Sequence, residues 1–466
     1  MKSMNNTRNS KNNNGSSSFK IFTTWSDDVQ SGGRLDAKYW LPAIRELQRA
    51  IQNGKYKSQK LGDFITDIRY GLSTTNDYVE FGIPFLRILN LKNDGLDLND
   101  LVYLLEEQKD EIGKAVVHQG DLLISRSGSV GIVVVIPKEA EGFAFGSFMI
   151  KFCLNDEINK DYVAAWLNSE ASRKLIEREK IGAIQGNITI ETIKNFDIPM
   201  PPLAVQNEVV KKIQGAYEKK HKKEQEIKML LASIDSFVLE ELGIEFDKTE
   251  GGGKITFHVW NSEMVNRIDP MYFHPVRLEA LTAIKKSSTP ISSLRDVVKF
   301  RREIVTNIPE NMPYIGLENI VSNSGEYAET NLKESIGSAF IFKKGDVLFP
   351  KLRPYLNKVF FADFDGVCST EFHVFEVQKC DPYFLFSFLT RSIVVEQTSR
   401  LMTGNTLPRL QTEDVENLLI PIPDEAKQSE IVGGVKTIYE KAKRLRKEAE
   451  YTVLEAQNQV EQMILA

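Results

Sequence analysis

The sequence predicts an α+β protein in which two globular domains alternate with two long helices that pair as an antiparallel coiled coil. Short sequence blocks recur in the same order in both halves of the chain, and each half ends in a long amphipathic stretch. Between these features, short apolar runs such as 122–124 and 347–349 mix with turn residues, which is typical of small α+β domains.

The composition is that of an ordinary water-soluble protein. Its 466 residues suit about two to four domains. No apolar run approaches the roughly 18–20 residues that span a bilayer, and no apolar segment of a secretory signal follows the first basic residues. We therefore expect a cytoplasmic protein. The net charge of −5 argues mildly against a nucleic-acid partner, although the positions of the basic groups matter more than their sum.

The sequence offers little for catalysis. The three cysteines, Cys153, Cys368 and Cys380, form no CxxC pair, which suits a reducing cytosol, and the histidines lie away from them, so no zinc site is expected. Motifs for a phosphate-binding loop, a dinucleotide fold and a zinc protease are missing. The Asn/Asp-Pro-Pro-aromatic block of an amino-methyltransferase is missing too, which disfavours a self-contained methyltransferase. We predict a non-catalytic chain with no cofactor or metal of its own.

Five blocks make up the internal repeat. Residues 34–42 read RLDAKYWLP and residues 267–275 read RIDPMYFHP, an offset of 233 positions (267 minus 34). The other blocks pair GDLL at 120–123 with GDVL at 345–348, Gly186-Asn187 with Gly404-Asn405, IPMP at 198–201 with IPIP at 420–423, and Gln206 and Glu208 with Gln428 and Glu430. Five collinear matches are hard to obtain by chance, so the chain is a duplication whose loops differ in length.

The segments between these blocks set the expected boundaries. Residues 1–19 are rich in Asn and Ser, as disordered tails are, and the Gly-rich run at 250–253 marks a flexible boundary. The expected order is a disordered tail at 1–19, a first globular domain at 20–202, a central helix at 203–243, a linker at 244–253, a second globular domain at 254–423 and a C-terminal helix at 424–466.

Each Ile-Pro-x-Pro block leads into one of the helices. Apolar residues recur at heptad spacing from Val209 in the first helix and from Ile431 in the second, and the two phases coincide at an offset of 222 (431 minus 209). About 40 residues would form a rod of roughly 60 Å. The basic run at 219–223 has glutamates beside it and is interpreted as a solvated face in preference to a DNA or partner contact.

Turns rich in basic, hydroxyl and amide groups are the candidate binding sites. Arg can contact guanine with two hydrogen bonds, Asn and Gln can do so with adenine, and Ser and Thr can contact phosphates. Several of these turns stand at equivalent places in both halves, which favours a reader of DNA over ordinary surface loops. The candidate residues are Arg69, Tyr70, Ser73, Thr74, Asn76, Ser125, Arg126, Ser127, Gln185, Asn187, Arg301, Arg302, Lys351, Arg353, Tyr355, Asn357, Asn405 and Arg409.

Over residues 20–466 the chain resembles the DNA-specificity subunit of type I restriction–modification systems. The resemblance rests on GDLLISRSGS at 120–129, YIGLENI at 314–320, LFPKLRPYLNKV at 348–359 and the doubled IPxP-x4-Q entry into a long helix. One departure is Val205-Gln206, where the family often has Glu-Gln.

The resemblance implies two target-recognition domains, each reading half of a bipartite double-stranded DNA site. The helices would fix the spacer and dock two modification (methyltransferase) subunits and the restriction subunits of a phage-defence system. S-adenosylmethionine, ATP and Mg would then be bound by those partners. Tandem domains on a rigid rod support such reading on geometric grounds. The main alternative from another class is a coiled-coil scaffold whose globular repeats bind protein; a specificity subunit of a related system is the alternative within the same class.

Overall fold

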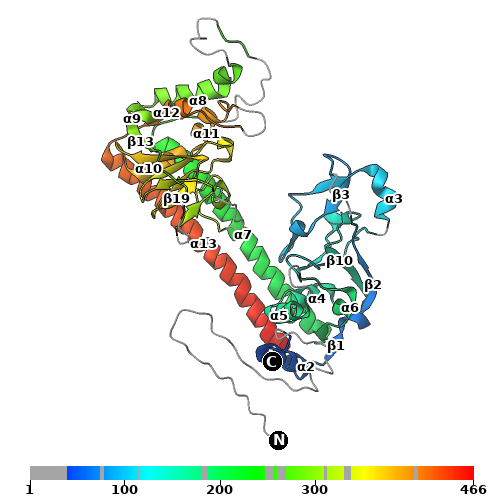
Figure 1. The fold of residues 1–466 in the computed structure, drawn as a ribbon. Coiled ribbons are helices and arrows are strands. Elements are labelled where there is room, and N and C mark those ends of the chain that lie inside the picture. The colour runs from blue at the N-terminus through cyan, green and yellow to red at the C-terminus, as the bar shows by residue number, and fades with distance from the viewer. Residues whose placement is uncertain are drawn as a thin grey trace. The chain divides into compact units, whose positions relative to one another are not determined.

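The structure is a computed structural model (Figure 1). It describes residues 39–73, 78–113, 115–180, 186–246, 257–260, 264, 269–308, 312–329, 337–403 and 408–465. The expected disordered tail at 1–19 and residues 247–253 of the expected linker lie outside this part. The chain forms two compact units. Unit 1 comprises residues 1–222 and 448–466, and unit 2 comprises residues 223–447, so each unit holds one globular domain and a part of each long helix.

Unit 1 is built around a four-stranded sheet in the order β2-β10-β7-β8. Its neighbours are antiparallel, and alternate residues face two cores. Leu122 and Ile124 pack in one hydrophobic cluster with Trp166, whereas Leu123 packs in another with Phe145. The strands of the unit are β1 (Ser58–Lys60), β2 (Ile65–Tyr70), β3 (Ile83–Leu86), β4 (Leu91–Lys92), β5 (Gly95–Leu96), β6 (Val102–Leu104), β7 (Leu122–Ser125), β8 (Val133–Val135), β9 (Ala144–Phe145), β10 (Met149–Leu154) and β11 (Asp197–Pro199). The shorter helices are α2 (Pro42–Gln52), α3 (Lys109–Ile112), α4 (Lys160–Leu167), α5 (Glu170–Glu179) and α6 (Ile190–Lys194).

Unit 2 repeats this plan. Its four-stranded sheet has the order β13-β20-β17-β18, and the small sheet β12-β21 corresponds to β1-β11 of unit 1. Its strands are β12 (Ile291–Ser293), β13 (Val298–Arg301), β14 (Ile304–Val305), β15 (Tyr314–Ile315), β16 (Ala339–Phe342), β17 (Val347–Pro350), β18 (Phe360–Phe361), β19 (Gly366–Ser369), β20 (Phe372–Val377) and β21 (Leu419–Pro421). The shorter helices are α8 (Pro275–Lys286), α9 (Leu294–Val297), α10 (Pro382–Leu389), α11 (Ser392–Thr398) and α12 (Thr412–Glu416). The shared topology agrees with the repeat found in the sequence.

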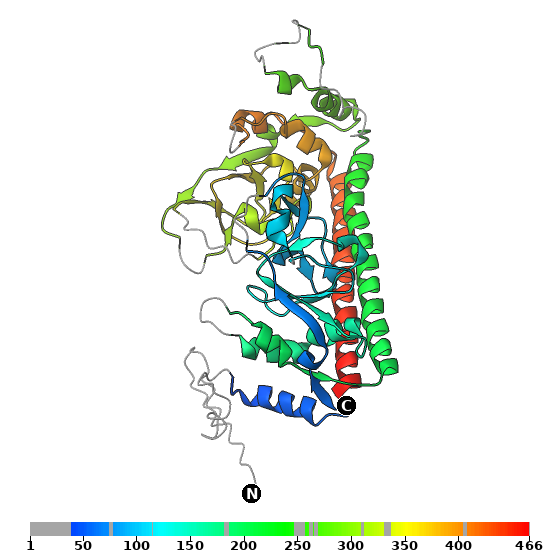
Figure 2. The same cartoon turned by 90° about the vertical axis from the view of Figure 1, so that its right-hand side faces the viewer.

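The two long helices are α7 (Leu203–Glu241) and α13 (Glu425–Leu465), and within each unit both views show a segment of one beside a segment of the other (Figures 1 and 2). In unit 1, Val209 near the start of α7 packs in one cluster with Val460 near the end of α13. In unit 2, Ile234 near the end of α7 packs with Ile431 near the start of α13. Within each unit the helices therefore run in opposite directions. Val209, Ile234 and Ile431 are positions of the expected heptad seam, and in unit 2 a further seam position, Ile227, packs with two residues of α13. Val460 is not a seam position: heptads counted from Ile431 reach Gln459 and Met463, whereas Val460 and Ile464 are the buried residues near the end of α13.

A glutamine near the start of each long helix joins that helix to its own domain. Gln206 is 1% exposed; its Oε1 accepts from the backbone N–H of Asn159 at 3.0 Å and its Nε2 donates to the Pro201 carbonyl at 2.9 Å. Gln428 makes the same pair of bonds in unit 2, with the N–H of Asp381 at 2.7 Å and the Pro423 carbonyl at 2.8 Å. Asn159 and Asp381 are the N-cap residues of α4 and α10.

A carboxylate from the other long helix caps a short helix of the domain. In unit 1, Glu461 of α13 accepts from the N–H of Ala171 in the first turn of α5, at 2.9 Å. In unit 2, Asp235 of α7 accepts from the N–H and the hydroxyl of Ser392 at 2.7 and 2.6 Å, at the first turn of α11. Unpaired amides of a first turn favour an acidic partner. In each unit the globular domain is thus held to one long helix by a glutamine side chain and to the other by a carboxylate.

The repeated block with Tyr39 and Tyr272 packs beneath an arginine in both units. The guanidinium of Arg178 lies 4.5 Å from the ring centre of Tyr39, and that of Arg277 lies 4.1 Å from the ring centre of Tyr272. Both arginines are buried, so the aromatic face offsets part of the loss of hydration. Of the described helices, none is both long and apolar enough to cross a membrane.

Two adjacent glycines of α13 provide a test of the helix packing in unit 2. A Cβ on Gly434 would lie 2.2 Å from Cζ of Phe237 on α7, whereas a Cβ on Gly433 would meet nothing within 4 Å. We expect Gly433→Ala to stabilise the protein by about 1 kcal/mol through helix propensity. Gly434→Ala should instead be destabilising by about 1–3 kcal/mol, because the Phe237 ring must leave its place. Urea unfolding of the full chain measures both, and equal effects would contradict the close packing.

Candidate nucleic-acid interface

In unit 1, the loops that carry candidate residues meet at one end of the four-stranded sheet, where β2 and β7 end and β10 begins. We call this end of the strands the edge. Tyr70 ends β2 and pairs with Ile150 of β10, and Ser125 ends β7 and pairs with Met149 of β10. The turn after β7 continues along this edge, where the N–H of Ile188 donates to the Arg126 carbonyl at 3.1 Å. We call the side chains of Tyr70, Arg126, Phe148 and Asn187 the edge surface of unit 1.

Unit 2 has the same backbone arrangement at the equivalent edge. The N–H of Lys351 donates to the Glu371 carbonyl at 2.8 Å, as the N–H of Arg126 does to that of Phe148 at 2.9 Å. The N–H of Leu410 donates to the Lys351 carbonyl at 2.9 Å, as that of Ile188 does to Arg126. The edge surface of unit 2 consists, by this correspondence, of Arg302, Lys351, Arg353, Glu371 and Arg409.

The turns that follow β7 and β17 share even a left-handed residue. Gly128 has φ +70° and Arg353 has φ +48°, two positions after the matched residues Arg126 and Lys351. The bridge between Ser127 and Asn187 corresponds to the bridge between Leu352 and Arg409. A non-glycine residue in this conformation is uncommon. The two edges thus share one backbone scaffold and differ in the side chains it carries.

The edge surface of unit 1 combines a cation with exposed aromatic rings. The Arg126 guanidinium lies 4.7 Å from the ring centre of Tyr70. Tyr70 is 41% exposed and Phe148 is 54% exposed. Nε of Arg126 is buried with no hydrogen-bond partner among the residues that the structure describes. A buried donor without a partner is costly.

The edge surface of unit 2 is more strongly charged. Arg353 is exposed, and the side chain of Arg302 is 69% exposed. Lys351 is half-buried; its Nζ donates to the Thr370 carbonyl at 2.7 Å and lies 4.7 Å from the ring centre of Phe340, and burial lowers its pKa. Arg409 binds both carboxylate oxygens of Glu371, at 2.9 and 2.7 Å. This hydrogen bonding lowers the pKa of Glu371, which keeps the carboxylate ionised at neutral pH.

Several residues expected at the interface have internal partners. The Ser125 hydroxyl donates to the Ser129 carbonyl and accepts from the N–H of Ile132, and Ser127 is buried. The amide of Asn357 is buried and donates to the Thr390 carbonyl at 2.8 Å. These residues shape the turns and do not present their side chains. Of the other candidates, Arg69 pairs with Asp67, Ser73 and Tyr355 are exposed, and Thr74, Asn76, Gln185 and Asn405 lie outside the described residues.

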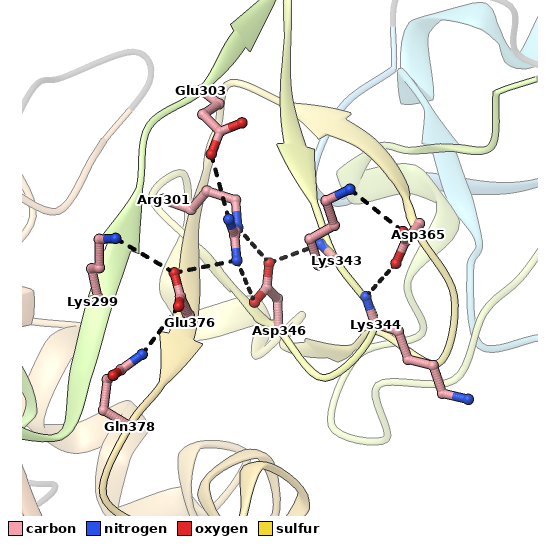
Figure 3. Close-up of polar contacts among 9 residues, drawn as sticks. All are labelled: Lys299, Arg301, Glu303, Lys343, Lys344, Asp346, Asp365, Glu376 and Gln378. Atoms are coloured by element: carbon pink, nitrogen blue, oxygen red, sulfur yellow. Dashed lines mark hydrogen bonds and ion pairs between the residues drawn. The ribbon is translucent and has the colours of Figure 1, made fainter.

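Arg301 also has internal partners (Figure 3). Its Nε is 2.9 Å from the carboxylate of Asp346, its Nη2 is 3.3 Å from that of Glu376, and its side chain is only 15% exposed. In unit 1 the matching Asp121 instead pairs with Lys151, 3.0 Å away on the central strand β10. The register puts Val374 where unit 1 has Lys151. The buried carboxylate is thus kept in both units, while its cation moves from the central strand to the edge strand.

Phe148 and Glu371 were missed by reasoning from the sequence. Phe148 precedes β10 and lies opposite the turn that carries Arg126; Glu371 precedes β20 and lies opposite the turn that carries Lys351. Only the strand register brings these residues together. Among the described residues, no group of three or more His, Cys, Asp or Glu is placed to hold a metal ion.

The comparisons with known proteins agree on one family. The family model described as "Type I restriction modification DNA specificity domain" matches residues 53–229 and 277–456. The type I restriction enzyme EcoDI specificity subunit of Escherichia coli is 31% identical over 139 residues, 30% of this chain and 31% of that protein. The EcoKI specificity subunit of Escherichia coli (strain K12) is 24% identical over 243 residues, 51% of each chain. The chain thus spans about a third and about half of these two relatives.

A solved structure is similar over most of the chain. The crystal structure of a type-I restriction-modification system S subunit from M. genitalium matches with a TM-score of 0.40 and 14% identity, covering 88% of this chain and 96% of that chain.

The two units place the cation beside the buried aspartate on different strands, which predicts that a second substitution can rescue the loss of Arg301. Arg301→Met should destabilise the protein by about 3–5 kcal/mol, because Asp346 is then buried with its main cation removed. Adding Val374→Lys should restore much of the loss, since unit 1 has its lysine at that register position. Lys299→Met is the control; this lysine is 73% exposed and 3.8 Å from Glu376, so its loss should change stability by less than about 1 kcal/mol. Urea unfolding of the full chain measures all three, and a double variant no more stable than Arg301→Met would refute the exchange.

Proposed function

The chain belongs to the family of type I restriction–modification DNA specificity domains, and on that premise we propose that it recognises a bipartite double-stranded DNA site, with one half-site for each globular domain. The observation that carries this proposal is the pair of edge surfaces. They share two matched backbone hydrogen bonds, a matched bridge and a left-handed residue at the same position, and they carry different side chains. Two copies of one scaffold with unlike surfaces suit two unlike half-sites.

The chemistry of the edge surfaces fits duplex DNA. An arginine beside an aromatic ring, as at Arg126 and Tyr70, presents a planar fork that can bind a base edge or a phosphate. The exposed Arg302 and Arg353 add positive charge in unit 2. The net charge of −5 is no obstacle to local contacts, because partner subunits can supply further positive charge along the duplex.

As a specificity subunit the chain is non-catalytic, and the chemistry then belongs to its partners. We propose that the long helices dock two modification subunits and the restriction subunits, which bind S-adenosylmethionine, ATP and Mg, and that the complex acts in the cytoplasm. Large apolar side chains exposed on the helices are candidate contacts for this docking: Met229 is 72%, Tyr451 65% and Leu454 48% exposed. If the complex shows no preference for any bipartite duplex over random DNA, the proposed recognition is refuted, and a scaffold whose globular repeats bind protein is the alternative that stands.

Replacing one arginine in each domain tests whether the domains read independently. We expect Arg126→Ala and Arg353→Ala each to weaken or relax recognition of one half-site, by about 1–3 kcal/mol, because each removes a fork from one edge surface only. The measurement is methylated-base mapping together with duplex binding by the complex with modification subunits. Arg49→Ala, on the exposed side of α2, is the control. Equal losses at both half-sites for either variant would contradict independent domains.

Lengthening both helices tests whether they set the spacer. Seven residues added to α7 after Lys222 and seven to α13 after Lys447 keep the heptad phase and lie where the two units divide. They add about 10 Å to the rod, which corresponds to about three base pairs of B-DNA. We expect the preferred spacer to grow by about three base pairs while both half-sites stay the same. An unchanged spacer would exclude the ruler.

A further inference from the structure

The ion pair between Arg409 and Glu371 uses only one side of the guanidinium. Nε donates to Oε2 of Glu371 at 2.9 Å and Nη2 donates to Oε1 at 2.7 Å. A guanidinium is planar and carries five N–H donors. Glu371 therefore occupies the fork formed by Nε and Nη2, while the end-on fork formed by Nη1 and the second Nη2 hydrogen points away from the carboxylate. The side chain of Arg409 is 43% exposed.

The backbone holds both members of the pair firmly. Arg409 exchanges two N–H···O hydrogen bonds with Thr403, both 2.9 Å, and forms a bridge with Leu352 in the turn after β17. The Glu371 carbonyl accepts from the N–H of Lys351 at 2.8 Å. The guanidinium thus projects from a fixed base and is held by a second residue, so little rotamer freedom remains to be lost on binding.

On the basis of the proposed function, we propose that Arg409 reads a guanine in the half-site of unit 2 through its end-on fork, and that Glu371 is the residue that positions it. The end-on fork matches the O6 and N7 acceptors of guanine in the major groove, the commonest specific contact between an arginine and a base. Glu371 acts through Arg409 and makes no contact with the base itself.

A base suits this arginine better than a phosphate does. Glu371 carries a negative charge beside the fork, and its pKa is lowered by the hydrogen bonds from Arg409, so it stays ionised and would repel a phosphate. The O6 and N7 atoms of guanine are neutral acceptors. The neighbouring Arg302 and Arg353 have exposed side chains and can serve the backbone. In unit 1 the equivalent positions hold Phe148 and Asn187, so this reading device is specific to unit 2.

The test uses the complex with modification subunits and duplexes that carry its own site, identified by methylation mapping. In the half-site of unit 2, each guanine is replaced in turn by 7-deazaguanine, which keeps base pairing but removes the N7 acceptor. We expect one such replacement to weaken binding by the wild type about tenfold or more. Arg409→Ala should bind the normal and the modified duplex equally, and Glu371→Gln should show an intermediate ratio. Arg49→Ala is the control and should keep the wild-type ratio, since Arg49 is exposed on α2 and belongs to neither edge surface.

The outcomes separate this inference from the function on which it rests. A complex without a bipartite preference would refute the proposed function itself. A bipartite preference in which Arg409→Ala keeps the full sensitivity to every 7-deazaguanine would refute only the guanine contact. A Glu371→Gln variant that keeps the wild-type ratio would refute the positioning role and leave the contact. Thermal unfolding of each variant checks that the fold is intact, and Arg409→Lys, which keeps the charge without the fork, should behave like Arg409→Ala.

Discussion

The two buried glutamines at the starts of the long helices are the constraint on which the rest of the structure depends. Gln206 and Gln428 each use both polar atoms of the side-chain amide in hydrogen bonds to the backbone. The nitrogen donates to a carbonyl just before the long helix, and the oxygen accepts from the N–H of the N-cap residue of a domain helix. A buried amide with both ends satisfied fixes direction as well as distance. Each domain is therefore held to its own helix at a defined orientation, and the edge surfaces inherit that orientation.

The second attachment makes each domain depend on both long helices. Glu461 of α13 caps a helix of unit 1, and Asp235 of α7 caps a helix of unit 2, so each domain also depends on the helix that begins in the other repeat. Neither half of the chain therefore provides all of the contacts that hold its own domain to the long helices. In each unit the amide and the acid act on neighbouring helices, α4 and α5 or α10 and α11. The unit is thus clamped to two antiparallel helix segments, which resist bending better than one.

The sequence predicts the parts of this architecture that depend on local pattern. Repeated blocks and heptad phase lead to two α+β domains and two long helices, because periodicity and the order of blocks can be read without tertiary contacts. The interface residues are harder to predict, because polarity alone does not tell a surface residue from a buried one. Ser125 and Asn357 look like readers in the sequence and are buried, whereas Phe148 and Glu371 were overlooked. Hydrogen bonds to backbone carbonyls hold the first pair in the interior, and strand register places the second; both are properties of the folded chain.

The comparison of the two units shows how one scaffold can carry different readers. The buried aspartates Asp121 and Asp346 stay fixed, while the cation that neutralises them sits on the central strand in unit 1 and on the edge strand in unit 2. A buried carboxylate needs a cation nearby, but the geometry accepts more than one source. The same freedom extends to the edge, where Phe148 is replaced by Glu371 and Asn187 by Arg409 without a change in the backbone bonds. Since matched backbone hydrogen bonds hold the edge in both units, exposed side chains there can differ and alter the surface while the fold stays the same.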